Sequence, residues 1–168
     1  LELWYCSNAK FRNNYLTKNN SNSGGALSIY QAAIDADFSN NIIANNTGYQ
    51  GGAIFASNSP AVLNNNTIVN NLSSAGGGMY ISNNTDFEIK NCIIYNNSAS
   101  GLGDQIYIAD IASDPKISYS LIDGDSAAFE GYGAHSNYTG FYQHNQDFAP
   151  LFNSASSGQG DAYDGLSA

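Results

Sequence analysis

Charged residues are scarce in this chain of 168 residues, because Asp, Glu, Lys and Arg together make up only 11% of it. Five residues are basic and 14 are acidic, so the formal net charge is −9. A nucleic-acid-binding surface needs clustered Lys and Arg to neutralise phosphates, and an anionic membrane surface makes the same demand. The composition therefore predicts no nucleic-acid partner and no attachment to an acidic membrane.

Long apolar runs and cysteines are also few. No apolar stretch approaches the roughly 18 residues that suggest a membrane-spanning helix, so we expect no membrane insertion. The two cysteines, Cys6 and Cys92, are too few for a disulfide scaffold or a zinc site. No signal peptide precedes the patterned region, which begins at Leu1, and we therefore expect a processed chain or a fragment of a longer one.

Asn and Gly, present 24 and 17 times, supply much of the polarity that charge does not. Both are poor helix formers, which disfavours a helical bundle. Hydrophobic residues still make up 42% of the chain, more than a disordered protein carries. Low charge, a low pI and many small polar residues together predict a folded protein that is extracellular or at the cell surface.

A motif recurs along residues 1–125 with a period of 25 to 28 residues. Its clearest copy is F-x-N-N-x-I-x-x-N from Phe38 to Asn46, followed by G-G-A-I from Gly51 to Ile54. Each copy holds short β-type runs between Asn, Ser and Gly, and none holds ten residues of helical periodicity. A propeller blade needs about 40 residues. The period therefore predicts an all-β fold, with one coil of a parallel β-helix per copy. The copies begin at Phe11, Phe38, Leu63, Ile89 and, in a weaker form, Ile117.

Equivalent positions of successive coils predict columns that run along the helix. The residues that begin the copies would form one apolar interior column, and those five positions later would form another. Gly51 and its equivalents would supply positive φ. The Asn residues would lie at bends in the left-handed region, with stacked side-chain amides. These Asn columns are Asn13, Asn40, Asn65 and Asn91, and Asn19, Asn46, Asn71 and Asn97. The sequence leaves open whether Ala53 or Ile54 points inward.

Residues 126–168 lack the repeat, and we expect an irregular C-terminal segment that caps the coils. A solenoid whose last coil is uncovered presents unpaired strand edges, which a cap would protect. Apolar residues of this segment are its expected anchors. They are Phe141, Phe148, Leu151 and Phe152.

The copies from Ile89 to Asn97 and from Gly51 to Phe55 resemble repeats of the right-handed parallel β-helix proteins in the pectin-lyase-like superfamily. They are similar to those of bacterial surface proteins and of the polymorphic outer-membrane proteins, with their GGAI and FxxN elements. The resemblance implies a right-handed parallel β-helix of about five coils. It is weak for function, since the fold hosts lyases, hydrolases, adhesins and structural proteins.

Residue types that commonly act in catalysis are few, with five Lys and Arg and two His in the chain. This scarcity favours a non-enzymatic protein, and we assign no catalytic residue. Asp123 and Asp125 would share a strand face and are the candidates for a metal site. The pair is more typical of a turn, so we expect no cofactor, with Ca²⁺ as the one ion to consider. Tyr132, Tyr138 and Tyr142 are candidates for stacking on a glycan, although aromatic anchors of a cap would have the same composition.

Seven Asn-x-Ser/Thr sequences would accept N-linked glycans only in a chain secreted by a eukaryotic cell. An Asn-rich bacterial repeat would contain them by composition alone. They lie at Asn19, Asn45, Asn65, Asn71, Asn83, Asn96 and Asn137.

The sequence thus predicts an extracellular or cell-surface structural or adhesive β-helix module without catalytic activity, and a candidate filament-forming subunit. Its expected partners are further copies joined end to end, other surface proteins or polysaccharide. The alternative is a carbohydrate-active β-helix, similar to a polysaccharide lyase or hydrolase, or a glycan-binding fragment of one. Two facing carboxylates in a groove would favour the enzyme.

Overall fold

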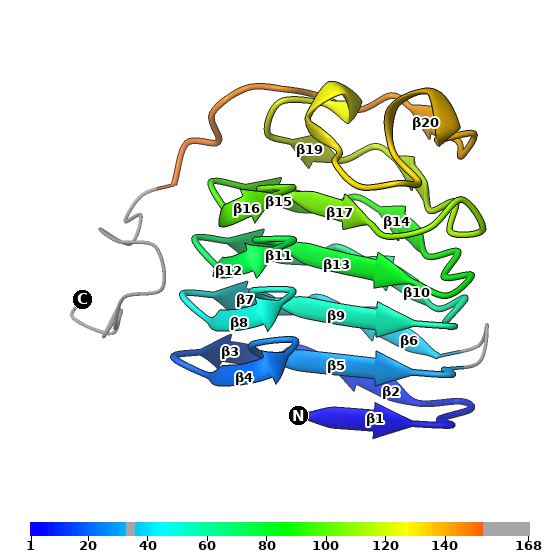
Figure 1. The fold of residues 1–168 in the computed structure, drawn as a ribbon. Helices are drawn as coiled ribbons and strands as arrows, with labels where there is room; N and C mark the ends of the chain where they lie inside the picture. Colours follow the sequence, from blue (N-terminus) through cyan, green and yellow to red (C-terminus); the bar gives the residue numbers. More distant parts are fainter. Residues whose placement is uncertain (33–35, 153–168) are drawn as a thin grey trace.

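Short strands lie on four faces of the first four coils and on three faces of the fifth, and neighbouring strands in each sheet pair in parallel from one coil to the next (Figure 1). The computed structural model describes residues 1–32 and 36–152. Sheet A contains β1 (Glu2–Trp4), β5 (Leu27–Tyr30), β9 (Ile54–Ser57), β13 (Met79–Ser82) and β17 (Ile106–Ile108). Sheet B contains β2 (Lys10–Arg12), β6 (Asp37–Ser39), β10 (Val62–Asn64), β14 (Glu88–Lys90), β18 (Lys116–Ser118) and β20 (Tyr142–Gln143).

The other two faces complete the coil and confirm the predicted all-β parallel β-helix of about five coils. Sheet C contains β3 (Tyr15–Thr17), β7 (Ile42–Ala44), β11 (Thr67–Val69), β15 (Ile93–Tyr95) and β19 (Leu121–Ile122). Sheet D contains β4 (Asn20–Ser23), β8 (Thr47–Gln50), β12 (Leu72–Ala75) and β16 (Ser98–Leu102). In the described part of the chain, no helix is long and apolar enough to cross a membrane.

The corners of the coil are made by single residues in the left-handed region. In the second coil these are Gln31, Asn40, Asn45 and Gly51, with φ of 54°, 56°, 58° and 72°, each directly after a strand. Asn tolerates this region better than other residues with a Cβ, and a Cβ on Gly51 would lie 2.2 Å from the Ile54 carbonyl oxygen. The predicted bends at Asn40 and Gly51 are confirmed.

Asparagine side chains form ladders inside the coil, one residue after the corners between sheets B and C and between sheets C and D. The predicted ladder through Asn46 is confirmed, since Asn46 donates to the Asn71 side chain at 2.9 Å. The left-handed residue at that corner is Asn45, however, and not Asn46. At the other corner Asn40 is left-handed, and Asn41 forms the ladder by donating to Asn66 at 3.0 Å. At each of these corners one Asn therefore turns the chain, and the next Asn forms the ladder.

The apolar columns fill the interior as predicted. Phe38, Leu63 and Ile89 are all buried and lie opposite one another in sheet B. The sequence leaves open whether Ala53 or Ile54 points inward. In sheet A, the side chain of Ile54 joins the core. Ala53 is also buried, in the turn just before the strand. Strand alternation then directs Phe55 to the outer face.

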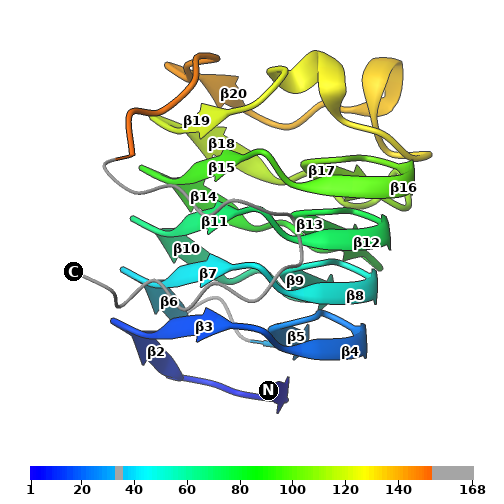
Figure 2. The same ribbon diagram turned by 90° about the vertical axis from the view of Figure 1, so that its left-hand side faces the viewer.

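Residues 126–146 lie across the end of the last coil, with the short 3₁₀ helices η1 (Ser126–Ala128) and η2 (His135–Asn137) (Figure 2). Phe129 of this segment is fully buried and joins the hydrophobic core. Tyr142 pairs with Ile117, so part of this segment extends sheet B. The side chain of Asn145 accepts a hydrogen bond from the Ser120 N–H at 2.9 Å, as the ladder residues do.

The predicted anchors of this segment are wrong, because Phe141, Phe148, Leu151 and Phe152 are exposed. Tyr142 takes the inward position opposite Ile117, and alternation therefore turns its neighbour Phe141 outward. The expected segment 126–168 is described as far as residue 152, and the rest lies outside the described residues.

Candidate functional site

Aromatic rings line the outer face of sheet A in every coil. Trp4 stacks on Tyr30 with ring centroids 4.0 Å apart and planes at 8°. Tyr30 and Phe55 are 5.3 Å apart, Phe55 and Tyr80 5.5 Å, and Tyr80 and Tyr107 5.0 Å. These five residues, called the aromatic column below, are 25 to 27 residues apart in the sequence. Their spacing equals the coil period, which is the signal that could have revealed the column and that the sequence analysis did not use.

The aromatic column changes position between the second and third coils. Trp4 and Tyr30 lie opposite each other in register, but the residue opposite Tyr30 in the next coil is Ser57. Phe55 lies two residues earlier, opposite Ser28, so its ring contacts Tyr30 only diagonally at an angle of 42°. The short side chain of Ser57 therefore leaves the far face of the Tyr30 ring without a stacked ring in its own column.

A hollow of about 420 Å³, here called the sheet A hollow, lies at this step. Its lining combines three aromatic rings with three carboxamides, and the carboxamides belong to residues on successive left-handed corners of the coil. Asn83 donates from its carboxamide to the Ser57 hydroxyl at 2.9 Å, which holds these two lining side chains together. The hollow is lined by Trp4, Tyr5, Tyr30, Gln31, Ser57, Asn58 and Asn83.

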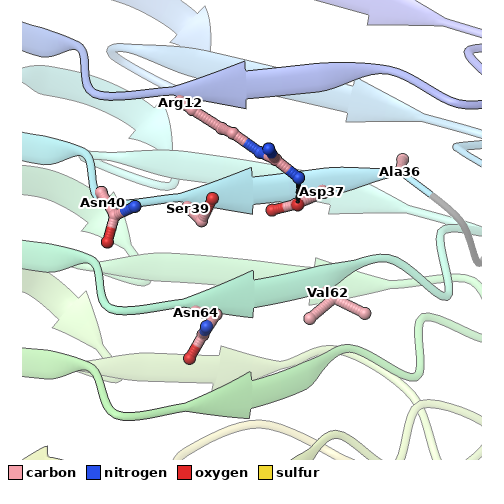
Figure 3. Close-up of a pocket in the computed structure, with 7 residues that line it drawn as sticks. All are labelled: Arg12, Ala36, Asp37, Ser39, Asn40, Val62 and Asn64. Carbon is pink, nitrogen blue, oxygen red and sulfur yellow. Dashed lines mark hydrogen bonds and ion pairs between the residues drawn. The ribbon is translucent and has the colours of Figure 1, made fainter.

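A second hollow, of about 430 Å³, lies on the outer face of sheet B and is called the sheet B hollow (Figure 3). Arg12 of β2 donates a hydrogen bond to the carboxylate of Asp37 on β6, which forms an ion pair across the two coils. The hydrogen bond from Arg12, and then that from Ser39, hold the pKa of Asp37 below its ordinary value. The hollow is lined by Arg12, Ala36, Asp37, Ser39, Asn40, Val62 and Asn64.

Sheet B also carries most of the positive charge of this acidic chain. Lys10, Arg12, Lys90 and Lys116, four of the five basic residues, belong to its strands. Lys90 forms its own ion pair with Glu88 at 2.6 Å, outside the hollow. The two cations are equally exposed, while Glu88 is more exposed than Asp37, so the second ion pair is a control on the same sheet for the first.

The predicted metal candidates make hydrogen bonds at the turn after the last full coil. The Asp123 carboxylate accepts from the Asn96 N–H at 3.2 Å and from the Gln105 amide at 3.3 Å. Asp125 precedes η1 with φ of 56°, and its carboxylate faces the hydroxyl of Tyr142. Within residues 1–32 and 36–152, no three His, Cys, Asp or Glu side chains gather where they could hold a metal ion.

The predicted stacking tyrosines are not brought together on the surface. Tyr138 and Tyr142 pack edge-on against Phe129, with centroid distances of 5.5 and 5.7 Å. Burial raises the pKa of both hydroxyls, and that of Tyr138 donates to the Pro115 carbonyl at 2.7 Å. Tyr132 is 68% exposed and stands apart from this cluster. The exposed rings that the fold aligns are instead those of sheet A.

Two of the predicted glycosylation sites are buried in the folded chain. Asn45 is 1% exposed and Asn71 is fully buried within a ladder, so a glycan on either would not fit. The remaining five predicted acceptors are exposed. They are Asn19, Asn65, Asn83, Asn96 and Asn137.

The stacked coils, polar corner ladders and outward hollows define the class of this protein as a parallel β-solenoid. The family model described as right-handed β-helix region matches residues 1–148. The chain belongs to this right-handed β-helix family. No curated protein and no solved structure matches it.

Proposed function

We propose that this β-helix is an extracellular or cell-surface adhesive module that binds carbohydrate in the sheet A hollow without catalysing a reaction. The observation that carries the proposal is that aromatic rings and carboxamides line the same hollow at the step of the aromatic column. Aromatic faces suit the C–H surface of a sugar ring, and carboxamides both donate to and accept from its hydroxyls.

The rigidity of the hollow supports binding. Gln31, Asn58 and Asn83 follow strands at equivalent corners, so the parallel register holds their backbones about 4.8 Å apart. Tyr30 is held on one side by Trp4 and diagonally by Phe55. A preorganised wall loses little conformational entropy when a ligand binds.

The chemistry of the lining favours binding over hydrolysis. Among the described residues that line the sheet A hollow, none carries a carboxylate, an imidazole or an ammonium group. The sheet B hollow contributes one carboxylate, Asp37, which is paired with Arg12. Glycosidases generally place two carboxyl groups about 5 to 10 Å apart, and neither lining supplies such a pair.

End-to-end association is the less supported part of the expected function. Glu130, Tyr142 and Gln146 add backbone pairing beyond the last full coil on sheets A, B and C. Another copy stacked on this end would have to displace them. The proposal is therefore restricted to binding through the side of the solenoid.

The test is carbohydrate binding by wild type and by Tyr30→Ala, first on immobilised neutral oligosaccharides and then by calorimetric titration of those retained. Removing an aromatic group at the centre of a site weakens binding by about 2 kcal/mol, roughly 30-fold. Tyr49→Ala is the matched control, because Tyr49 is 64% exposed on β8 of sheet D, outside both linings.

Asn58→Ala, which leaves the aromatic column intact, is a second variant in case loss of Tyr30 disturbs the stacking, and it should also weaken binding. Equal affinity of all four proteins would refute the site. Release of new reducing ends from any retained oligosaccharide would refute the non-catalytic assignment.

A further inference from the structure

We propose that the sheet B hollow is a second carbohydrate site, which recognises two adjacent hydroxyl groups of a sugar through the Arg12–Asp37 ion pair. The sheet A hollow is uncharged, whereas this one presents a guanidinium and a carboxylate side by side. The second site does not depend on the first, and each can be tested while the other is intact.

The ion pair is placed diagonally across two coils. Lys10 lies opposite Asp37 and Arg12 lies opposite Ser39, so the Arg12 side chain reaches along β6 to meet the carboxylate (Figure 3). An aspartate carboxyl group is ionised at neutral pH, and the hydrogen bond from Arg12 and that from Ser39 lower the pKa of Asp37 further. Lys10 adds a further positive charge that favours the ionised form.

Both groups of the pair retain hydrogen-bonding capacity toward the hollow. A carboxylate offers about four lone-pair sites, and a guanidinium offers five N–H donors. The contact with Arg12 joins one guanidinium nitrogen to one carboxylate oxygen. Two neighbouring sugar hydroxyls could therefore donate to the carboxylate and accept from the guanidinium, in hydrogen bonds strengthened by the charges.

The rest of the lining suits a sugar ring. Val62, which lies opposite Asp37 in the next coil, offers a small apolar surface, and the side chain of Ser39 on β6 is short (Figure 3). The Asn64 carbonyl oxygen accepts from the Asn91 amide at 2.9 Å. That bond engages the Asn64 side-chain oxygen, and the NH₂ group of the same carboxamide can serve as another donor for a hydroxyl.

The two hollows lie on neighbouring faces of the same coils, since sheet B follows sheet A after the corner that begins at Gln31. Two sites on a rigid rod would let one module bridge two glycan chains or bind one branched glycan with avidity. This bivalence is suited to adhesion.

The experiment is a ¹⁵N–¹H NMR titration of the full chain, including the side-chain amides, with methyl glycosides of glucose, mannose and galactose and with their oligosaccharides. We expect signals of Asn40 and Asn64 to shift with their own saturation curve, separate from those of Asn58 and Asn83. Asp37→Asn should weaken binding at sheet B at least about 10-fold, because it removes a charged acceptor, and leave sheet A unchanged. Deoxy sugars that lack one hydroxyl of the adjacent pair should lose a similar factor.

Glu88→Gln is the matched control, since it removes the carboxylate of the other ion pair on the same sheet. Thermal unfolding of both variants checks that the coils remain intact. Shifts confined to sheet A would overturn the second site and leave the proposed function standing, while shifts confined to sheet B would do the reverse. No shifts on either face, or equal effects of Asp37→Asn and Glu88→Gln, would overturn the second site.

Discussion

Asn71→Ala should destabilise the protein more than most single substitutions, because Asn71 is a central member of a buried ladder. Its carbonyl oxygen accepts from the backbone N–H of Asn46 at 2.9 Å and from the Asn46 amide at 2.9 Å. Its own amide faces the carbonyl oxygens of Ile43 at 2.9 Å and Val69 at 3.0 Å and the side chain of Asn97 at 2.9 Å. Alanine would remove all five contacts in a fully buried place.

The magnitude follows from the partners left behind. A hydrogen bond contributes about 1 kcal/mol net, and a buried donor left without an acceptor costs a further 1 to 3 kcal/mol or so. The Asn46 N–H would be such a donor. We therefore expect a loss of about 3 to 5 kcal/mol, which is a large part of the roughly 5 to 15 kcal/mol that stabilises a typical domain. For a chain of this length it corresponds to a fall in Tm of about 6 to 20 °C.

The assay is urea unfolding followed by circular dichroism, with Asn19→Ala as the matched control. Asn19 is the first member of the same ladder, is exposed, and donates to Thr17 and Asn46. Its loss should lower the stability by about 1 kcal/mol or less. The reasoning would be refuted if the two variants were equally stable, or if Asn71→Ala lost less than about 1 kcal/mol.

Further predictions concern three side chains, those of Cys92, Asp37 and Phe129. Burial raises the pKa of Cys92 to about 11, so iodoacetamide at pH 8 should alkylate the partly exposed Cys6 well before Cys92, and equal rates would contradict this. Because the folded thiol resists ionisation, stability should fall as the pH rises from about 9 toward 11, and Cys92→Ala should show a smaller fall in urea titrations. Arg12→Gln should raise the pKa of Asp37 toward its ordinary value, measured by carboxyl ¹³C NMR, because it removes the largest cause of the lowering; an unchanged pKa would contradict the ion pair. Phe129→Ala should cost about 3 to 5 kcal/mol and increase hydrogen exchange in β18 and β19 more than in β6 and β7, whereas uniform exchange would contradict a local capping role.

The sequence could predict the coil because each repeat encodes its own corners. Asn40 and Gly51 recur with the period, and their preference for positive φ is a local property of the backbone. The interior columns through Phe38 and Ile43 also recur, so the number of coils and the apolar core were both predictable.

Local chemistry could not assign the roles of adjacent Asn residues. In the pairs Asn40–Asn41 and Asn45–Asn46 one member turns the chain and the other forms the ladder, and both are the same amino acid. Only the placement of the neighbouring coil decides which amide meets a partner. The same applies to Phe141 and Tyr142, where the inward position is fixed by the pairing of Tyr142 with Ile117.

The two candidate sites could not be predicted from the sequence. The step from Tyr30 to Ser57 becomes a hollow only through the register of β5 and β9, and the meeting of Arg12 with Asp37 needs β2 beside β6. The aromatic column of sheet A does recur with the coil period, but the other residues that line the two hollows differ from coil to coil, so no repeat marks the hollows themselves. The sequence alone thus determined that the chain winds into stacked β coils, because turns and core are repeated local requirements. The tertiary structure decided which groups face one another on the surface, because that depends on contacts between residues a full coil apart.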